Sequence, residues 1–178
     1  MRALSAFTGI GGFDLGLQEA GIEVVDQIEF EAHCQAILRR HFPTANLMGD
    51  ITDVHGSDLS DGIDVATAGF PCQNTSIGAP HRLGLAGPKS SKFFDFVRLL
   101  QEYQRVIADA RPRWVVIENP PGILKSNSGR DMATVVRCVE ELGYGWAYRV
   151  VDGRHLGSAQ RRPRVLLVGH RADDPPPA

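Results

Sequence analysis

Short apolar runs alternate with amphipathic stretches along the whole chain, a pattern typical of a sheet whose strands are joined by helices. Strands are expected at residues 3–7, Glu23–Ile28, Asn46–Met48, 63–68, 114–117, 146–151 and 165–168. Helices are expected at residues 13–20, 31–41, 96–107 and 131–142. The pattern therefore predicts an α/β fold, with a mostly parallel twisted sheet and helices on both of its faces.

The clearest of these helices has one apolar face. Its large apolar residues recur at the 3.6-residue period of a buried helical stripe: Phe96, Leu99, Leu100, Tyr103, Val106 and Ile107. The chain has 178 residues, of which 43% are hydrophobic, and no internal repeat or linker divides it. We expect one domain over residues 1–170 and a flexible tail over residues 171–178.

Composition places the chain in a reducing compartment. The three cysteines are odd in number and widely spaced, without the pairing that a disulfide framework or a zinc site requires. No apolar run is long enough for a membrane span, and no signal peptide is recognisable. We expect a cytoplasmic protein with no metal and no membrane partner.

The charge is unevenly distributed. Residues 1–110 hold 8 Lys and Arg against 14 Asp and Glu, whereas residues 111–178 hold 11 against 7. The basic end is the better candidate for a nucleic-acid face, and the alternative is an uneven solvated surface.

A glycine-rich turn follows the first strand. It contains Phe7, Gly9, Ile10, Gly11 and Gly12. The glycines let a ligand approach the backbone at the start of a helix, but position 14 is Asp, so the dinucleotide fingerprint fails and a phosphate cradle is disfavoured.

Acidic residues follow the next two strands at Glu29 and Asp50, with Phe30 beside the first. Carboxylates suit ribose hydroxyls and an exocyclic amine, and an aromatic ring suits a purine. The pattern favours an adenosine ligand without pyrophosphate, such as S-adenosylmethionine; the alternative is a structural turn with surface acids.

Three further segments carry candidate chemistry. Phe70, Pro71, Cys72 and Gln73 follow the fourth strand, where a cysteine after a rigid Pro is either a nucleophile or a small core residue. Glu118 and Asn119 follow a very apolar strand, which predicts a raised pKa for the carboxyl. Gln160, Arg162 and Arg164 lead into the last strand and suit a phosphate or a polarised carbonyl.

Taken in order, these segments resemble the motifs of the DNA (cytosine-5) methyltransferase family. The similar motifs are Phe-x-Gly-x-Gly-Gly at residues 7–12, the ribose acid Glu29, Gly-Asp-Ile ending at Ile51, Pro-Cys-Gln around Cys72, Glu-Asn at Glu118, and Gln-x-Arg-x-Arg from Gln160 to Arg164. The resemblance implies a Rossmann-like methyltransferase fold. One departure is Pro120-Pro121, where the family usually has Val after Glu-Asn.

The resemblance implies a role for each group of residues. Cys72 would attack carbon 6 of cytosine, Glu118 would protonate ring nitrogen 3, and Arg162 and Arg164 would hold the base and the nucleophile loop. Pro71, Gln73, Asn119 and Gln160 would contact the substrate. Residues 7 and 9–12 with Glu29, Phe30, Asp50, Ile51 and Phe70 would bind S-adenosylmethionine. The target base would be flipped out of the duplex.

The resemblance also implies what the sequence does not supply. Family members continue beyond the Gln-x-Arg-x-Arg strand with a target-recognition region and a last helical motif. We therefore expect target recognition that is minimal or is supplied by a second polypeptide. The alternatives are an inactive remnant that binds DNA or cofactor, and an enzyme acting on transfer RNA. An amino-methyltransferase is disfavoured because Gly122 stands where its Asn-Pro-Pro motif needs an aromatic residue.

Overall fold

The computed structural model describes residues 1–71, 92–107 and 111–173. It contains a seven-stranded sheet in the order β3-β2-β1-β4-β5-β7-β6. The pairs β1–β2, β1–β4 and β2–β3 are parallel, and β6 runs antiparallel to β7. The predicted α/β fold with a mostly parallel sheet is confirmed.

The chain divides into two compact units. The first comprises Met1–Gly69 and Phe94–Val115, and the second comprises Phe70–Phe93 and Val116–Ala178. The predicted boundary between a domain over residues 1–170 and a tail over residues 171–178 is not tested by this division and stays a prediction.

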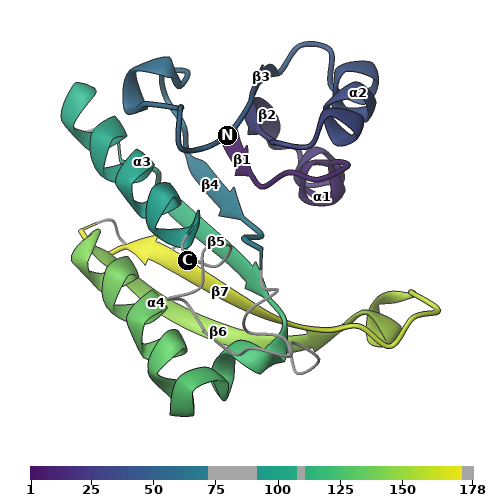
Figure 1. Ribbon diagram of the computed structural model, residues 1–178, viewed down its shortest axis with the longest axis vertical. Helices are drawn as coiled ribbons and strands as arrows, with labels where there is room; N and C mark the ends of the chain where they lie inside the picture. The colour runs from purple at the N-terminus through teal and green to yellow at the C-terminus, as the bar shows by residue number, and fades with distance from the viewer. Residues whose placement is uncertain (72–91, 108–110, 174–178) are drawn as a thin grey trace. The chain divides into compact units, whose positions relative to one another are not determined.

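The first unit contains the parallel part of the sheet (Figure 1). Its strands are β1 (Arg2–Ala6), β2 (Glu23–Ile28), β3 (Asn46–Met48) and β4 (Val65–Ala68). Its helices are α1 (Gly12–Glu19), α2 (Ala32–His41) and most of α3 (Lys92–Val106), with a short 3-10 turn at Gly56–Asp58. Helices α1 and α2 lie on one face of these strands and α3 on the other.

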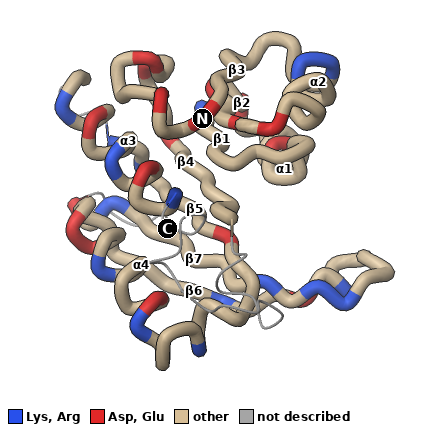
Figure 2. The backbone as a smooth tube through the Cα atoms, viewed as in Figure 1, with Lys and Arg blue, Asp and Glu red and all other residues tan. Residues whose placement is uncertain are grey.

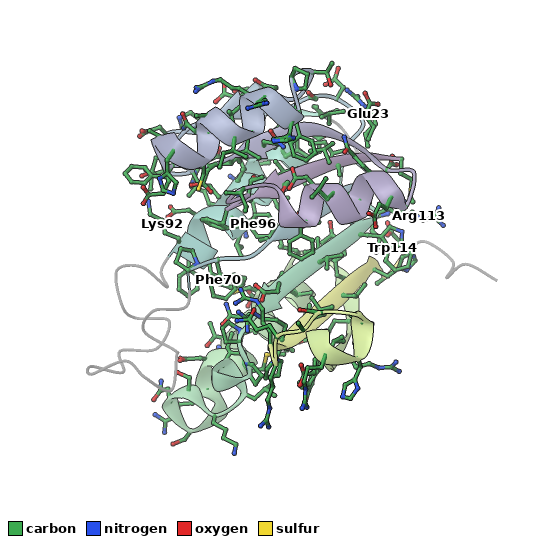
Figure 3. The ribbon with its side chains drawn as sticks, turned by 90° about the vertical axis from the view of Figure 1, so that its right-hand side faces the viewer. Glu23, Phe70, Lys92, Phe96, Arg113 and Trp114 are labelled. Carbon is green, nitrogen blue, oxygen red and sulfur yellow. The ribbon has the colours of Figure 1, made fainter. Side chains whose placement is uncertain are left out.

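The core of this unit follows the predicted periodicities. Strand β4 is buried along its whole length, as expected for a strand covered on both faces. Most of the apolar stripe of α3 is buried, including Phe96, which is labelled in Figure 3, and Tyr103, but Val106 at its end is exposed. Trp114, also labelled there, enters β5 through a 2.9 Å backbone hydrogen bond to the carbonyl of Asp64.

The second unit contains an antiparallel hairpin and one long helix. Its elements are the end of β5 (Trp114–Asn119), α4 (Arg130–Glu141), β6 (Tyr144–Asp152) and β7 (Pro163–Arg171). Three 3-10 turns, Pro121–Leu124, Ser126–Gly129 and Gly153–Leu156, connect them. Val135, Val139 and Leu167 are buried between α4 and the hairpin.

Strands β5, β6 and β7 extend further than the sequence predicts, and the extensions of β5 and β7 include candidate site residues. Strand β5 continues to Asn119, so Glu118 and Asn119 lie within the strand, with Asn119 buried and Glu118 half-buried. Side chains alternate along a strand, so these two residues point to opposite faces of the sheet. Strand β7 likewise begins at Pro163 and includes Arg164. Within the described residues, no helix is both long and apolar enough to cross a membrane.

Candidate active site

The glycine turn of the first unit has an unusual backbone. Phe7, Gly9 and Gly11 all have positive φ, at 57°, 59° and 92°. Such a conformation is costly for Phe7, which has a side chain, and strained residues of this kind concentrate at ligand-binding sites. The Thr8 hydroxyl supports the turn by donating to the carbonyls of Ser5 and Ile28, at 2.8 and 3.2 Å.

The glycines of this turn have different surroundings. A Cβ on Gly11 would lie 2.6 Å from the ring of Phe42, so this position is filled by packing against α2. A Cβ on Gly9 or Gly12 would meet nothing within 4 Å. The turn therefore packs closely at Gly11 and leaves open space at Gly9 and Gly12, and the side chain of Ile10 is exposed beside them.

Glu29 closes the turn from the end of β2. Its carboxylate accepts hydrogen bonds from the backbone N–H groups of Gly9 and Glu31, each at 2.7 Å. In a phosphate-binding loop the N–H of Gly9 would be free to bind the ligand. Here the Glu29 carboxylate accepts that N–H, and its negative charge would repel a phosphate. The turn therefore fits a ligand that carries no phosphate, and the neighbouring Phe30 side chain, 68% exposed, is available for stacking.

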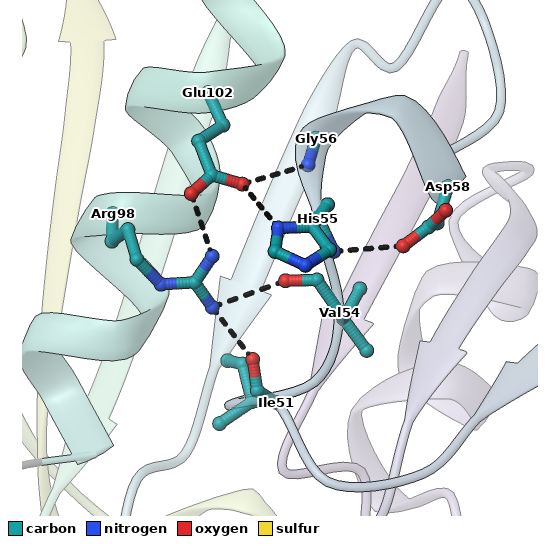
Figure 4. A network of polar contacts seen from close by, with 7 residues as sticks. All are labelled: Ile51, Val54, His55, Gly56, Asp58, Arg98 and Glu102. Carbon is teal, nitrogen blue, oxygen red and sulfur yellow. Dashed lines mark hydrogen bonds and ion pairs between the residues drawn. The ribbon is translucent and has the colours of Figure 1, made fainter.

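The segment after β3 is anchored by α3 (Figure 4). The Arg98 guanidinium donates to the carbonyls of Ile51 and Val54 at 2.7 and 3.0 Å, and to Glu102 at 2.8 Å. The hydrogen bond from Arg98 lowers the pKa of Glu102, which also accepts from the N–H of Gly56. Ile51 is buried, whereas Asp50 is half-buried and accepts from the N–H of Thr52 at 3.0 Å.

A buried carboxyl lies beneath the glycine turn. Asp14, in the first turn of α1, is fully buried and accepts from Ser5 Oγ at 3.0 Å and from Gln27 Nε2 at 2.7 Å. Burial raises its pKa. In the sequence pattern, Asp14 only excludes a dinucleotide fingerprint, and Arg98 belongs to none of the candidate motifs. The signal for Arg98 was its i,i+4 spacing from Glu102 on an amphipathic helix.

The second unit brings another group of predicted residues together. Glu118, at the end of β5, forms an ion pair with Arg164, at the start of β7. Burial raises the pKa of Glu118 and outweighs the opposite effects of Arg164 and Arg162. The raised pKa agrees with the prediction from the apolar strand, and it lets the carboxyl hold a proton closer to neutral pH.

Asn119 faces away from this pair and fixes the segment that leads to Cys72. Its amide donates to the carbonyl of Phe70 at 3.3 Å, and the ring of Phe70 packs against Phe93 with centroids 5.1 Å apart. Phe70 is buried, and its predicted cofactor contact stays a prediction. Pro71 is half-buried, while Cys72 and Gln73 lie outside the described residues.

The remaining predicted residues flank β7. Gln160 and Arg162 are exposed, and their backbone N–H groups donate to Ser158 and Asp152. The described residues contain no group of three or more His, Cys, Asp or Glu side chains that could hold a metal. The acid, the two arginines and the anchored entry to Cys72 thus lie in one unit, and the glycine turn with Glu29, Asp50 and Ile51 lies in the other.

The chain belongs to the C-5 cytosine-specific DNA methylase family, whose model matches residues 1–177. Members of this family use S-adenosylmethionine and act on DNA. The chain is 36% identical over 175 residues to the type II methyltransferase M2.BsuMI of Bacillus subtilis (strain 168), covering 98% of this chain and 43% of that protein. It is 29% identical to the type II methyltransferase M.NgoPII of Neisseria gonorrhoeae, covering 97% of this chain and 49% of that protein.

Solved structures agree on the fold. The Dnmt2 methyltransferase of S. pombe superposes with a TM-score of 0.74 at 20% identity, covering 99% of this chain and 52% of that chain. This likeness supports the Rossmann-like methyltransferase fold that the sequence predicts. The chain spans about half the length of the relatives it matches.

Proposed function

We propose that this chain transfers a methyl group from S-adenosylmethionine to carbon 5 of cytosine in DNA through a covalent adduct with Cys72. The observation that carries the proposal is the Glu118–Arg164 pair, in which a carboxyl of raised pKa is held beside a guanidinium. Family membership supports the same reaction.

Each residue has a defined part in the proposed reaction. The Cys72 thiolate forms a bond to carbon 6 of the flipped cytosine, the ring electrons move toward carbon 5, and Glu118 delivers a proton to ring nitrogen 3. Arg162 and Arg164 stabilise the carbonyl side of the base. Pro71, Gln73, Asn119 and Gln160 are the proposed substrate contacts, with Asn119 acting through the backbone of Phe70.

Bound S-adenosylmethionine supplies the methyl group to carbon 5. Loss of the carbon 5 proton to a base, with return of the nitrogen 3 proton to Glu118, then restores the ring double bond and releases the Cys72 sulfur. No step requires a metal.

The glycine turn and its acids are the proposed cofactor site. Phe7 and residues 9–12 shape the open turn, Glu29 and Asp50 receive ribose hydroxyls or an amine, Phe30 stacks on the purine, and Ile51 forms an apolar wall. Phe70 stays a proposed cofactor contact. The fit rests on the carboxylate at Gly9, which disfavours phosphates, and on the open space beside Gly9 and Gly12.

The test measures methyl transfer from labelled S-adenosylmethionine to mixed-sequence duplex DNA, followed by nucleoside analysis. We expect 5-methylcytosine with the wild type and with Cys138→Ser, a matched substitution of a thiol on α4, and none with Cys72→Ser. Label on an exocyclic nitrogen would contradict the role of Cys72. No label with the wild type contradicts activity of this chain alone and favours the inactive remnant.

The substrate and the source of target selection are tested in parallel. Transfer RNA in the same assay distinguishes an RNA enzyme from a DNA enzyme. We further propose that target recognition is minimal within these residues or is supplied by another polypeptide. Sequencing of the methylated positions should show many sequence contexts, or activity that requires an added partner, and one strict context with the chain alone contradicts this.

A further inference from the structure

An arm extends from the sheet of the second unit (Figure 1). It consists of residues 153–162, which join β6 to β7, and it begins where the strand ladder ends at the pair Asp152–Pro163. Residues 154–162 are all exposed. The arm contains the 3-10 turn Gly153–Leu156, which ends at Gly157 with a φ of 87°.

The two ends of the arm are joined by hydrogen bonds at its base. The Asp152 carboxylate accepts from the N–H groups of Arg154 at 3.2 Å and Arg162 at 3.1 Å. The N–H of Gly153 donates to the carbonyl of Arg162 at 3.3 Å, and that of Ser158 donates back to Gly153 at 3.0 Å. The arm is therefore a built hairpin extension whose base is fixed by the fold.

The surface of the arm combines positive charge with one exposed apolar side chain. Arg154, His155, Arg161 and Arg162 lie along it, and Figure 2 shows the arginines as blue segments of the extension. Arg154 is engaged by Asp152 at 3.0 Å, whereas the side chain of Arg161 forms no hydrogen bond or ion pair within the described part of the chain. Leu156, between these basic residues, is 74% exposed, more than any other large hydrophobic side chain described.

We propose that this arm is a DNA-contacting element, in which Arg161 contacts a backbone phosphate and Leu156 inserts as a wedge between neighbouring base pairs. The inference rests on the proposed function. Within the part of the chain that the structure describes, the side chain of Leu156 is left largely uncovered among arginines. Apolar wedges flanked by basic residues are the means by which proteins unstack and kink a duplex.

The position of the arm matches this role. Its base adjoins Arg164 of β7, and that guanidinium pairs with Glu118, the proposed acid, on β5. In this proposal Leu156 acts on base pairs beside the cytosine held at Glu118, where unstacking eases base flipping.

Two measurements test the two contacts separately, with the whole 178-residue chain. Binding to a labelled mixed-sequence 30-bp duplex is followed by fluorescence anisotropy over a salt series. Unstacking is measured as the change in linking number of a nicked plasmid that is ligated with the protein bound. Neither measurement requires a known target sequence.

Each variant has a matched control in the first unit. Arg161→Gln is paired with Arg40→Gln, an exposed arginine of α2, and Leu156→Ala is paired with Val106→Ala, an apolar residue of α3 that is 57% exposed. Arg161→Gln should reduce the slope of log affinity against log salt by about 0.9, the value for one lost phosphate contact. Leu156→Ala should leave that slope unchanged, weaken binding roughly tenfold and abolish most of the linking-number change. The controls should behave as wild type.

Several results would overturn the proposal. They are wild-type binding without any linking-number change, arm variants that match their controls, and arm variants that lose binding to anionic lipid vesicles while duplex binding is unchanged. Methyl transfer by the wild type is measured independently. If the wild type transfers methyl groups but the arm variants bind DNA as the wild type does, only the proposed role of the arm is refuted. If the arm variants bind DNA differently but the wild type transfers no methyl group, only the proposed function is refuted.

Discussion

The glycine turn of the first unit differs in construction from the cluster of Glu118, Arg162 and Arg164 in the second unit. At the turn, the Glu29 carboxylate is occupied by backbone N–H groups, and shape comes from strained backbone and small residues. At the cluster, charged side chains from β5 and β7 meet with part of their surface still accessible. Under the proposed function, the first unit binds the cofactor by fixed shape, while the second supplies chemistry through the Glu118 carboxyl, whose raised pKa suits proton exchange.

The largest expected effect is a loss of kcat on removal of the Glu118 proton donor, with the glycine turn left unchanged. Glu118→Gln keeps the size of the side chain and removes the exchangeable proton. We expect kcat to fall by about 10²–10⁴-fold, the usual contribution of a general acid, with little change in KM for S-adenosylmethionine. Steady-state kinetics on duplex DNA measure both constants.

The control for this variant is Glu141→Gln, an exposed glutamate at the end of α4, which should leave both constants unchanged. If Glu118→Gln instead raised KM for the cofactor and spared kcat, the division of labour between the two regions would be wrong.

The next effect comes from filling the tight side of the glycine turn. Gly11→Ala places a Cβ 2.6 Å from Phe42 at a φ of 92°, and we expect it to destabilise the fold by about 2–3 kcal/mol. Gly9→Ala meets no atom within 4 Å and incurs only the cost of its positive φ, about 1 kcal/mol. Urea unfolding of both variants measures the difference, and equal losses would show that packing against α2 does not define the turn.

A smaller effect should follow from releasing the segment after β3. Arg98→Gln removes the donors to the carbonyls of Ile51 and Val54, and we expect a loss of about 1.5–3 kcal/mol in stability together with weaker cofactor binding. Arg105→Gln, an exposed arginine on the same helix, is the matched control. Calorimetry with S-adenosylmethionine that shows unchanged affinity for Arg98→Gln would remove this segment from the cofactor site.

The smallest effect concerns pH. Burial raises the pKa of Asp14 above its unfolded value, so its contribution to stability is fully present below the unfolded pKa and is lost as pH rises through the folded pKa. Asp14→Asn carries no charge and should flatten this dependence, with a change on the order of 1 kcal/mol. Unfolding free energies at pH 4.5 and pH 8 measure it. An unaltered dependence in the variant would show that Asp14 ionises at no cost.

Much of the fold could be predicted because apolar periodicity determines which face of each element is buried. Strand β2 and strand β3 match their predicted bounds, and helix α3 begins four residues before its first predicted apolar position. The sequence predicts the end of β5 too early and the start of β7 too late, because Glu118, Asn119 and Arg164 are polar. Neighbouring strands, rather than side-chain polarity, decide where a strand stops.

The candidate site could be predicted in its residues but not in its connections. The order of the motifs pointed to Glu29 and Glu118, yet nothing local to either residue shows that one binds the N–H of Gly9 and the other pairs with Arg164. Both contacts join segments distant in sequence. The support from Arg98 and Asp14 was missed for the same reason, since the value of a charge inside a fold depends on neighbours that the tertiary structure supplies.

The hydrogen bond from the N–H of Arg162 to the Asp152 carboxylate joins the two ends of the arm. It has a consequence for how the length of this chain can vary in evolution. In an antiparallel hairpin, an insertion or deletion of one residue within the ladder turns every following side chain to the other face. Such a change in β7 before Arg164 would direct that guanidinium away from Glu118. Insertions outside the ladder, between Gly153 and Arg161, preserve the pairing. Natural relatives that retain the Glu118–Arg164 pair should therefore differ in length inside this loop while keeping the register of the strands on either side of it.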